Sequence, residues 1–447
     1  MVQCSFSKET LNKIEITKLY PPRSDRLRLE KKYHSLIRED LTLNRIVSFV
    51  GNKTIPFLRL YRYKEAFAFD FVQRFLKYFN LTSNDYVLDP YVGMGTTCFA
   101  SMLHHIPSVG VDKLPVAVFV AKTLPLFFSL KEGELTSCFE RLTKIVHSKE
   151  PAEVALDVPI MRLAFTNENL LALRRWKTVI DELDQPLKDI FKLLFLSILE
   201  ECSFTSKDGQ FLRLKKNKKF LKPEEALKRK VREAEEDIIR IKHFFGYHNL
   251  DKEYLPTIFL GDARELSKIS FERPPSVIIT SPPYVNRYDY SRTSSLELCF
   301  EFVKNFEELK KIRFGLLRSH IESKVSSEEK PPHPSVAEVI EALSHKRLNN
   351  PRIPHMLTAY FIDMKKCIEE WRKVLAPNAK VAMVVDNVRF EGELIPVDLI
   401  LSEIAEEEGF QVKEIIISRY KGNSSQQMRK YGKIPVRESV VVWQLKT

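Results

Sequence analysis

The stretch Val277-Ile278-Ile279-Thr280-Ser281-Pro282-Pro283-Tyr284 is the most informative part of this sequence. Its first residues are an apolar, β-branched run that predicts a buried strand. Two prolines end that strand, because proline has no N–H for the sheet ladder and its ring fixes φ. Their carbonyls and the Tyr284 ring can then line a cleft that suits a planar group with an amine. A Pro-Pro pair by itself is typical of a turn, so this interpretation needs a second motif.

The second motif lies upstream, in Tyr86-Val87-Leu88-Asp89-Pro90-Tyr91-Val92-Gly93-Met94-Gly95-Thr96-Thr97. Its pattern predicts a strand, a tight turn and the start of a helix. The chain has only 13 Gly among 447 residues, so two of them one residue apart after a strand favour a functional turn. Glycine permits positive φ and a close approach of the backbone to a ligand. Thr96 or Thr97 can cap the helix, whose N-terminus then faces that ligand.

Together the two motifs resemble those of the amino-methyltransferases that use S-adenosylmethionine to modify exocyclic amines of DNA bases. In that family the first motif is D-P-F-x-G-x-G-T-T, and residues 89–97 match it with Tyr91 in place of Phe. The second is S/D/N-P-P-Y/F, which residues 281–284 match as Ser-Pro-Pro-Tyr. The Ser form is most similar to the cytosine-N4 branch, whereas the Asp and Asn forms are commoner among adenine-N6 enzymes.

The resemblance implies an α/β fold: a Rossmann-like, seven-stranded, mostly parallel sheet with a terminal antiparallel hairpin, here with a helical insertion. It also implies S-adenosylmethionine as the cofactor. The residues of the first motif expected to bind it are Asp89, Pro90, Tyr91, Gly93, Gly95, Thr96 and Thr97.

Three further cofactor residues are expected outside the first motif. Tyr63 begins an amphipathic segment, residues 63–79, that resembles the family's lining of the methionine end, although its periodicity alone indicates an ordinary core helix. Asp112 ends the second predicted strand, where an acidic residue can bind ribose hydroxyls, or can simply be solvated. Asp262 follows the third predicted strand, where the family's Asp accepts the adenine amino group.

The same resemblance assigns the chemistry to Ser281, Pro282, Pro283 and Tyr284. The Ser281 hydroxyl oxygen and the Pro282 carbonyl would accept both N–H bonds of the amine and favour the pyramidal nitrogen that attacks the methyl group in line. These hydrogen bonds strengthen as positive charge develops on nitrogen, so they stabilise the transition state. Tyr284 would stack on the base. Because duplex DNA hides the amine, the base must be flipped out, at a cost of a few kcal/mol.

The net charge of +12 favours a polyanionic partner, and double-stranded DNA is the one expected. Residues 207–232 hold eleven Lys or Arg against three acidic residues, a net charge of +8. Such a run can bind phosphates with salt-sensitive affinity, or can be a solvated surface. The residues expected to contact DNA are Lys215, Lys216, Lys218 and Lys219 of this run, and Arg287 and Arg292 after the second motif.

Composition and periodicity divide the chain into six parts. They are an N-terminal extension with one or two helices (1–55), the catalytic domain's first part (56–125), a helical basic insertion suited to target recognition (126–250), the catalytic domain's second part (251–309), a second insertion (310–355), and its C-terminal part (356–447). The predicted strands are 86–89, 108–112, 257–263, 276–280, 380–386, 411–418 and 439–445. The loop 419–437 resembles a late motif of the family that can touch the flipped nucleotide.

The cysteines and histidines predict no metal site. The six Cys form no C-x-x-C pair, which favours free thiols in a reducing cytoplasm. No apolar run approaches membrane-spanning length, so a cytoplasmic, nucleoid-associated enzyme without a membrane partner is expected.

Three alternatives remain open. The acceptor can be adenine N6, the substrate can be an RNA base, or the chain can be a non-catalytic nucleic-acid-binding protein that kept the fold. A cognate restriction endonuclease is a partner that the resemblance allows. The sequence indicates neither the recognition site nor the oligomeric state.

Overall fold

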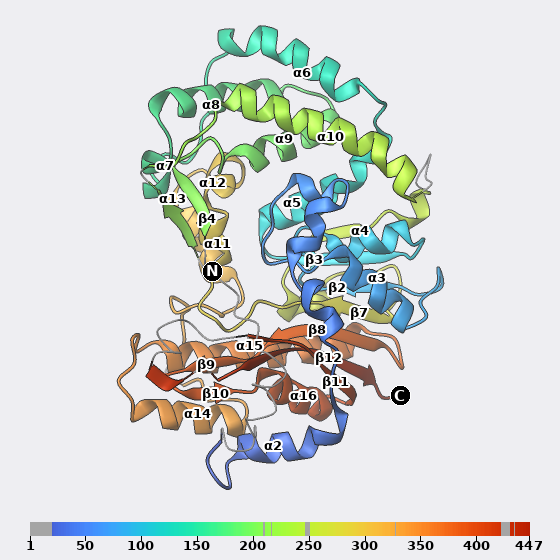
Figure 1. Ribbon diagram of the computed structural model, residues 1–447, viewed down its shortest axis with the longest axis vertical. Helices are drawn as coiled ribbons and strands as arrows, with labels where there is room; N and C mark the ends of the chain where they lie inside the picture. Colours follow the sequence, from blue (N-terminus) through green and yellow to red (C-terminus); the bar gives the residue numbers. More distant parts are fainter. Residues whose placement is uncertain are drawn as a thin grey trace.

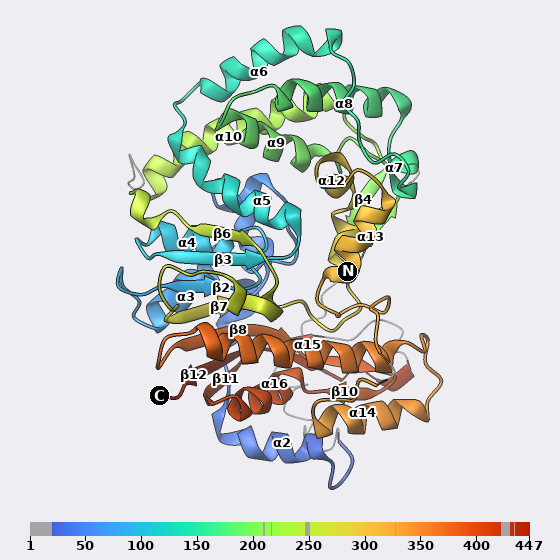
Figure 2. The same cartoon turned by 180° about the vertical axis from the view of Figure 1, so that it is seen from behind.

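The computed structural model describes residues 20–208, 211–215, 217–245, 251–326, 328–421, 430–432 and 434–447. Its centre is an eight-stranded sheet (Figures 1 and 2). In spatial order the strands are β1 (Ile37–Glu39), β11 (Phe410–Lys421), β12 (Val436–Leu445), β8 (Lys380–Asp386), β7 (Val277–Thr280), β2 (Val87–Asp89), β3 (Ser108–Asp112) and β6 (Thr257–Leu260). Within this sheet β12 alone runs antiparallel to its neighbours.

The predicted fold class is confirmed, since all seven predicted strands are present and β11 pairs with β12 as the terminal hairpin. The eighth strand, β1, comes from the N-terminal extension and pairs in parallel with β11, Ile37 opposite Ile415. The sequence does not predict β1, because three residues with one apolar side chain carry no alternation. The predicted sheet was therefore one strand too narrow.

The order of the strands brings the two sequence motifs together. From β2 the chain moves to β3 and then to β6 at one edge, and returns to β7 on the other side of β2. In the shared register Leu88 lies opposite Ile278. The switch point of the sheet therefore lies between β2 and β7, and ligands of open α/β sheets bind at the carboxyl ends of strands at such a point.

Alternate side chains of the strands enter two separate cores. Val87 and Ile279 face the core shared with α3 (Phe69–Tyr78), α4 (Thr96–Leu103) and α5 (Pro115–Thr123). Leu88 and Ile278 face the core shared with α15 (Ile353–Val374) and α16 (Val397–Glu407). Burial on both faces explains why these strands read as continuous apolar runs in the sequence.

The segment between α5 and β6 forms the helical layer at the top of Figure 1 and the β4–β5 hairpin below it. Its elements are α6 (Glu134–Ile145), α7 (Pro159–Ala164), α8 (Asn167–Asp181), α9 (Leu187–Ile198), β4 (Thr205–Asp208), β5 (Phe211–Leu214) and α10 (Pro223–Phe245). The β4–β5 hairpin is not predicted by the basic sequence that forms it. Strand β5 packs against α11 (Tyr290–Thr293), which follows the second motif, so the hairpin borders the tetrad's loop.

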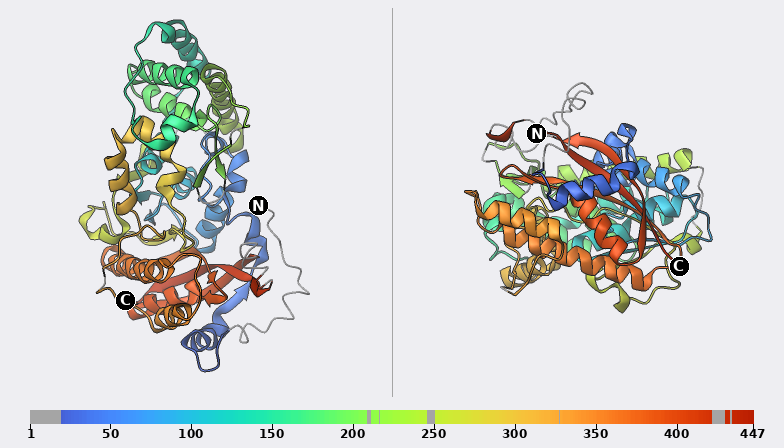
Figure 3. Two further views of the ribbon diagram at one scale, coloured as in Figure 1. Left: turned by 90° about the vertical axis from the view of Figure 1, so that its left-hand side faces the viewer. Right: turned by 90° about the horizontal axis from the view of Figure 1, so that it is seen from below.

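The N-terminal helix α2 (Asp25–Tyr33) packs at the other end of the molecule, against α14 (Pro334–Ser344) and α16. Figure 3 shows this blue helix beside the red C-terminal elements. The buried guanidinium of Arg26 pairs with Glu338 of α14 at 2.8 Å. The elements that complete the fold are α12 (Ser295–Glu297), α13 (Phe306–Gly315), β9 (Val388–Phe390) and β10 (Glu393–Ile395). Among the helices of the described residues, none has the length and hydrophobicity needed to cross a bilayer.

Candidate active site

The glycine turn after β2 forms one wall of a pocket at the carboxyl edge of the sheet. Gly93 has a φ of +52°, and a Cβ there would lie 3.2 Å from the Tyr63 ring. Gly95 has a φ of +92°, and a Cβ there would lie 2.9 Å from the Ala121 Cβ of α5. Gly93 therefore keeps the pocket open, whereas Gly95 lets α4 pack against α5.

This first pocket collects most of the predicted cofactor residues. Eight of the ten line it: Tyr63, Asp89, Pro90, Tyr91, Gly93, Thr96, Asp112 and Asp262. Gly95 and Thr97 do not line it. Ser281 and Pro283 of the second motif also line this pocket, so the two distant motifs share one cavity.

Asp89 joins the ends of β2 and β7. Its carboxylate accepts hydrogen bonds from the Oγ1 atoms of Thr97 and Thr280, both at 2.6 Å, and from the Tyr91 amide at 3.1 Å. Burial raises the pKa of Asp89 to about 6, although these hydrogen bonds act to lower it. Thr97 therefore acts on the pocket through Asp89, by fixing the carboxylate that holds the two motifs side by side.

The raised pKa of Asp89 predicts a pH-dependent stability. From pH 4 to pH 6 the unfolded chain releases the Asp89 proton before the folded chain does, so the free energy of unfolding falls as pH rises. Two pKa units correspond to about 3 kcal/mol. We expect Asp89→Asn to remove this part of the fall, measured by urea unfolding at several pH values. An Asp251→Asn control should keep it, and a parallel fall in Asp89→Asn and wild type would contradict the assignment.

Asp112 links the tip of β3 to the glycine turn. Its Oδ2 accepts from the Gly93 amide at 2.9 Å, and its Oδ1 accepts from the Leu114 amide at 2.8 Å. Burial raises the pKa of Asp112, and these backbone hydrogen bonds act to lower it. The Lys113 amide also acts to lower this pKa. Because a carboxylate has about four acceptor sites, acceptor capacity remains for a further donor. A vicinal diol, such as that of a ribose, matches this arrangement.

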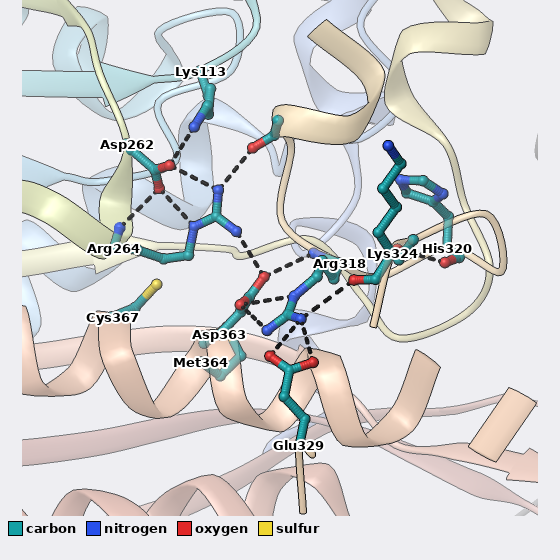
Figure 4. Close-up of polar contacts among 12 residues, drawn as sticks. Lys113, Asp262, Arg264, Arg318, His320, Lys324, Glu329, Asp363, Met364 and Cys367 are labelled. Atoms are coloured by element: carbon teal, nitrogen blue, oxygen red, sulfur yellow. Dashed lines mark hydrogen bonds and ion pairs between the residues drawn. The ribbon is translucent and has the colours of Figure 1, made fainter. Parts of the chain in front are cut away.

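Asp262 lies in the ion-pair network of Figure 4. Its Oδ1 accepts from the Arg264 amide and Nε, and its Oδ2 accepts from Arg264 Nη2 and Lys113 Nζ. Burial opposes ionisation of Asp262, but these donors lower the pKa of its carboxyl to about 2. Four donors fill the carboxylate's acceptor sites. For Asp262 to accept an adenine amino group, the half-exposed Lys113 must therefore turn away.

Arg264 connects Asp262 to a second group of charged residues, which begins on α15. Its Nη1 donates to the buried Asp363 of α15 at 2.8 Å. Asp363 also accepts from Arg318, which in turn donates to Glu329 at 2.8 Å. The sequence does not predict this network, since its members are single charges in segments with no motif. Leu316, Leu317 and His320, near Arg318, complete the pocket wall.

A second, more polar pocket lies next to the first. Ser281, Glu65, Ala66 and Tyr290 line both pockets. The side chains that line only the second pocket include Pro282, Tyr284, Asn286, Tyr288, Asp386, Arg419, Lys421 and Glu438. Ser281 therefore lies where the two pockets meet.

A cluster of buried and half-buried charges lines this second pocket. Lys421 Nζ lies 2.8 Å from Glu438 Oε1 and 3.1 Å from Asp386 Oδ2. Arg419 Nε donates to the other oxygen of Glu438, and the Tyr284 hydroxyl donates to Glu438 Oε1 at 3.0 Å. Burial raises the pKa of Asp386 to about 6. The predicted late loop 419–437 thus contributes the ends of β11 and β12, whereas residues 422–429 and 433 lie outside the described residues.

The residues predicted to contact DNA occupy different environments. Lys215 and Lys219 are exposed, and Lys216 lies outside the described residues. Lys218 donates to the carbonyls of Glu200 and Thr205, so its ammonium closes the base of the hairpin.

The two predicted arginines after the tetrad contact other parts of the protein. Arg287 lies over the Phe390 ring, 5.8 Å from its centroid. Arg292 pairs with Asp289 and Glu322.

Comparison with known proteins gives the family. No family model matches the chain. The chain is 31% identical over 478 residues to the Type II methyltransferase M.BsoBI of Geobacillus stearothermophilus, an alignment that covers 95% of this chain and 93% of that protein. The chain belongs to the Type II DNA methyltransferases. The methyl donor of this methyltransferase is S-adenosylmethionine.

Other relatives agree. The Type II methyltransferase is 32% identical over 454 residues to M.AvaI of Nostoc sp., covering 93% of this chain and 92% of that protein. It is 23% identical to M.MvaI of Kocuria varians, covering 71% and 73% of the two chains.

Solved structures give weaker likenesses. TrmN from Thermus thermophilus matches with a TM-score of 0.27 and 9% identity, over 84% of this chain and 48% of that one. The rRNA methyltransferase aviRa from Streptomyces viridochromogenes matches with a TM-score of 0.30 and 12% identity, over 91% of this chain and 93% of that one. Both TM-scores are low, so the assignment of the fold rests on the sheet topology of this methyltransferase itself.

Proposed function

We propose that this Type II methyltransferase methylates the exocyclic N4 amine of a cytosine flipped out of double-stranded DNA. The observation that carries the proposal is that Ser281 lines two adjoining pockets. The first pocket contains the cofactor motif, and the second is polar and is lined by Pro282 and Tyr284 of the tetrad. A methyl donor in one and a base in the other would meet at Ser281. The Ser form of the tetrad favours cytosine N4 over adenine N6.

The first pocket fits S-adenosylmethionine, since Gly93 leaves room beside Tyr63 and Asp112 offers free acceptor sites to a diol. When bound, this cofactor supplies a methyl group on a positively charged sulfur. In our proposal Asp112 holds the ribose hydroxyls, Asp262 receives the adenine amino group once Lys113 turns away, and Tyr63 bounds the methionine end.

The second pocket would hold the base. Ser281 Oγ and the Pro282 carbonyl accept the two N–H bonds of the amine and direct its lone pair toward the first pocket. Because these acceptors bind more strongly as charge develops on nitrogen, they stabilise the transition state rather than the ground state. The Tyr284 ring, held through its hydroxyl by Glu438, gives the base a flat surface.

Transfer of a radioactive methyl group tests this proposal and its RNA alternative. The protein is incubated with tritium-labelled S-adenosylmethionine and either unmethylated plasmid DNA or total RNA. We expect label in double-stranded DNA and none above background in RNA. Label in RNA alone would favour the RNA alternative, and label in neither would favour a non-catalytic protein.

The exposed lysines of the basic hairpin should set the salt dependence of DNA binding. We expect Lys215→Gln with Lys219→Gln to reduce the slope of log K against log salt by about 2, since each phosphate contact contributes about 0.9. Fluorescence anisotropy of labelled duplex DNA at several salt concentrations measures it. The control is Lys413→Gln, an exposed lysine of β11 away from both pockets. An unchanged slope in the hairpin variant would mean that this run is only solvated surface.

A further inference from the structure

The Ser281 hydroxyl can act in two opposite ways. A serine hydroxyl has one proton to donate and two lone pairs that accept, whereas the ionised aspartate of related tetrads only accepts. An exocyclic amine presents N–H groups to the tetrad, so a productive Ser281 must direct its lone pairs at the amine and its own proton elsewhere. The environment of Ser281 therefore has to fix the direction of its hydroxyl.

Glu438 is the start of a chain of hydrogen bonds that can do this. It lies on β12, directly opposite Asp386 of β8 and Arg419 of β11 in the sheet register, so three strands fix the cluster. Glu438 is 1% exposed. Burial opposes its ionisation, but Lys421 and Arg419 hold the pKa of its carboxyl below the usual range. Because Lys421 Nζ lies 2.8 Å from one oxygen of Glu438 and Arg419 Nε donates to the other, Glu438 is a carboxylate, which can only accept hydrogen bonds.

The next member of the chain is Tyr284, whose hydroxyl lies 3.0 Å from Glu438 Oε1. Because Glu438 only accepts, the phenol must donate its single proton to it. Burial, and then the neighbouring Glu438 charge, raise the pKa of Tyr284 well above its ordinary value, so the phenol keeps that proton. With its proton committed to Glu438, the Tyr284 oxygen can only accept from its other neighbours.

The last member is Ser281, whose Oγ lies 3.5 Å from the Tyr284 hydroxyl and donates to it. This distance is long for a hydrogen bond between two hydroxyls, so the contact is weak and its role is to fix the direction of the Ser281 proton. When Ser281 donates to Tyr284, its proton is committed, and its lone pairs remain to accept from a donor at the junction of the two pockets. The direction of both hydrogen bonds, from Ser281 to Tyr284 and from Tyr284 to Glu438, thus follows from the Glu438 carboxylate.

We propose that Glu438 is a positioning residue that acts through Tyr284 to hold the Ser281 hydroxyl as an acceptor for the amine of the target base. This inference rests on the proposed function, since it assigns how the tetrad receives the amine. Glu438 lines the second pocket, but in this scheme it acts on the amine through the hydroxyl groups of Tyr284 and Ser281. Its role is to set the direction of two hydroxyl groups.

This series of hydrogen bonds predicts an unusual result for Glu438→Gln. Glutamine has one carbonyl oxygen where glutamate has two acceptors, and Arg419 and Lys421 both need one. Lys421 keeps Asp386 as a partner, so the amide oxygen should turn to Arg419 and the NH2 to Tyr284. The polarity then reverses: Tyr284 accepts from glutamine and donates to Ser281, and the Ser281 proton points at the amine.

The test compares Glu438→Gln, Tyr284→Phe and the double variant in single-turnover methylation of DNA. We expect Glu438→Gln to lower the rate about 100-fold, in the range found when one preorganised catalytic hydrogen bond is lost. Tyr284→Phe should lower it about threefold to tenfold, because Ser281 is then free to turn either way. Adding Tyr284→Phe to Glu438→Gln should raise the rate back to that of Tyr284→Phe alone, since no phenol is left to pass on the reversed polarity.

The controls distinguish an effect of these hydrogen bonds on the rate from a loss of folding. Glu403→Gln removes a carboxylate that also pairs with an Arg and a Lys, Arg28 and Lys32, but lies on α16, and it should keep the wild-type rate. Cofactor and DNA affinities should stay within about twofold in the three variants. A double variant slower than Glu438→Gln, or a wild-type rate in Glu438→Gln, would overturn the proposal. If the wild type itself transfers no methyl group to DNA, the proposed function fails instead.

Discussion

Replacement of Ser281 by alanine is expected to lower the methylation rate by about 100-fold to 1,000-fold, the range found when one preorganised catalytic hydrogen-bonding group is removed. Ser281 lies where the two pockets meet. In the proposed mechanism alanine leaves the amine with the Pro282 carbonyl as its only acceptor from the tetrad. Because the backbone and both pockets remain, the affinities for S-adenosylmethionine and DNA should not change.

Single-turnover methylation measures this rate, and calorimetry and anisotropy measure the two affinities. Ser344→Ala, at an exposed serine of α14, is the matched control and should react as the wild type does. A Ser281→Ala protein with unchanged turnover would remove Ser281 from the chemistry.

The second large effect is expected at Asp112. Asp112→Ala should weaken binding of S-adenosylmethionine by at least about 100-fold. Hydrogen bonds to a charged group are worth about 1.5–3 kcal/mol each, two are expected to the ribose, and about 1.4 kcal/mol is a factor of ten. The variant also loses the acceptors of the Gly93 and Leu114 amides, which fix the turn.

Isothermal calorimetry with S-adenosylmethionine measures the loss. Asp112→Asn, which keeps one carbonyl oxygen, should lose less than alanine does, and the exposed Asp251→Ala should bind as the wild type does. A dissociation constant within twofold of the wild type in Asp112→Ala would show that the cofactor's diol binds elsewhere.

Much of the fold was predictable because its signals are local. Each of the seven predicted strands is an apolar run bounded by turn residues, and each motif directly follows a strand. The resemblance to the amino-methyltransferases then implied the Rossmann-like sheet that these strands form. Strand β1 and the β4–β5 hairpin were missed, since β1 has three residues and the hairpin's sequence is dominated by its charge.

The polar parts of the site were less predictable. Asp386, Arg419 and Glu438 meet only because β8, β12 and β11 pair in one register, and no local pattern marks them. A count of charges likewise does not tell which are neutralised inside the protein. In the basic run, Lys207 pairs with the buried Glu297, and Lys218 binds backbone carbonyls. The run's net charge of +8 therefore overstates what it can offer to DNA.

The most direct measurement is the identity of the nucleoside that the protein modifies. Unmethylated duplex DNA is incubated with the protein and S-adenosylmethionine, digested to nucleosides and analysed by mass spectrometry against synthetic standards. The result predicted here is N4-methyldeoxycytidine, formed by the wild type and lost in Ser281→Ala. N6-methyldeoxyadenosine in its place would contradict the assignment of cytosine, and DNA with no methylated base would contradict an amine-methylating site at the junction of the two pockets.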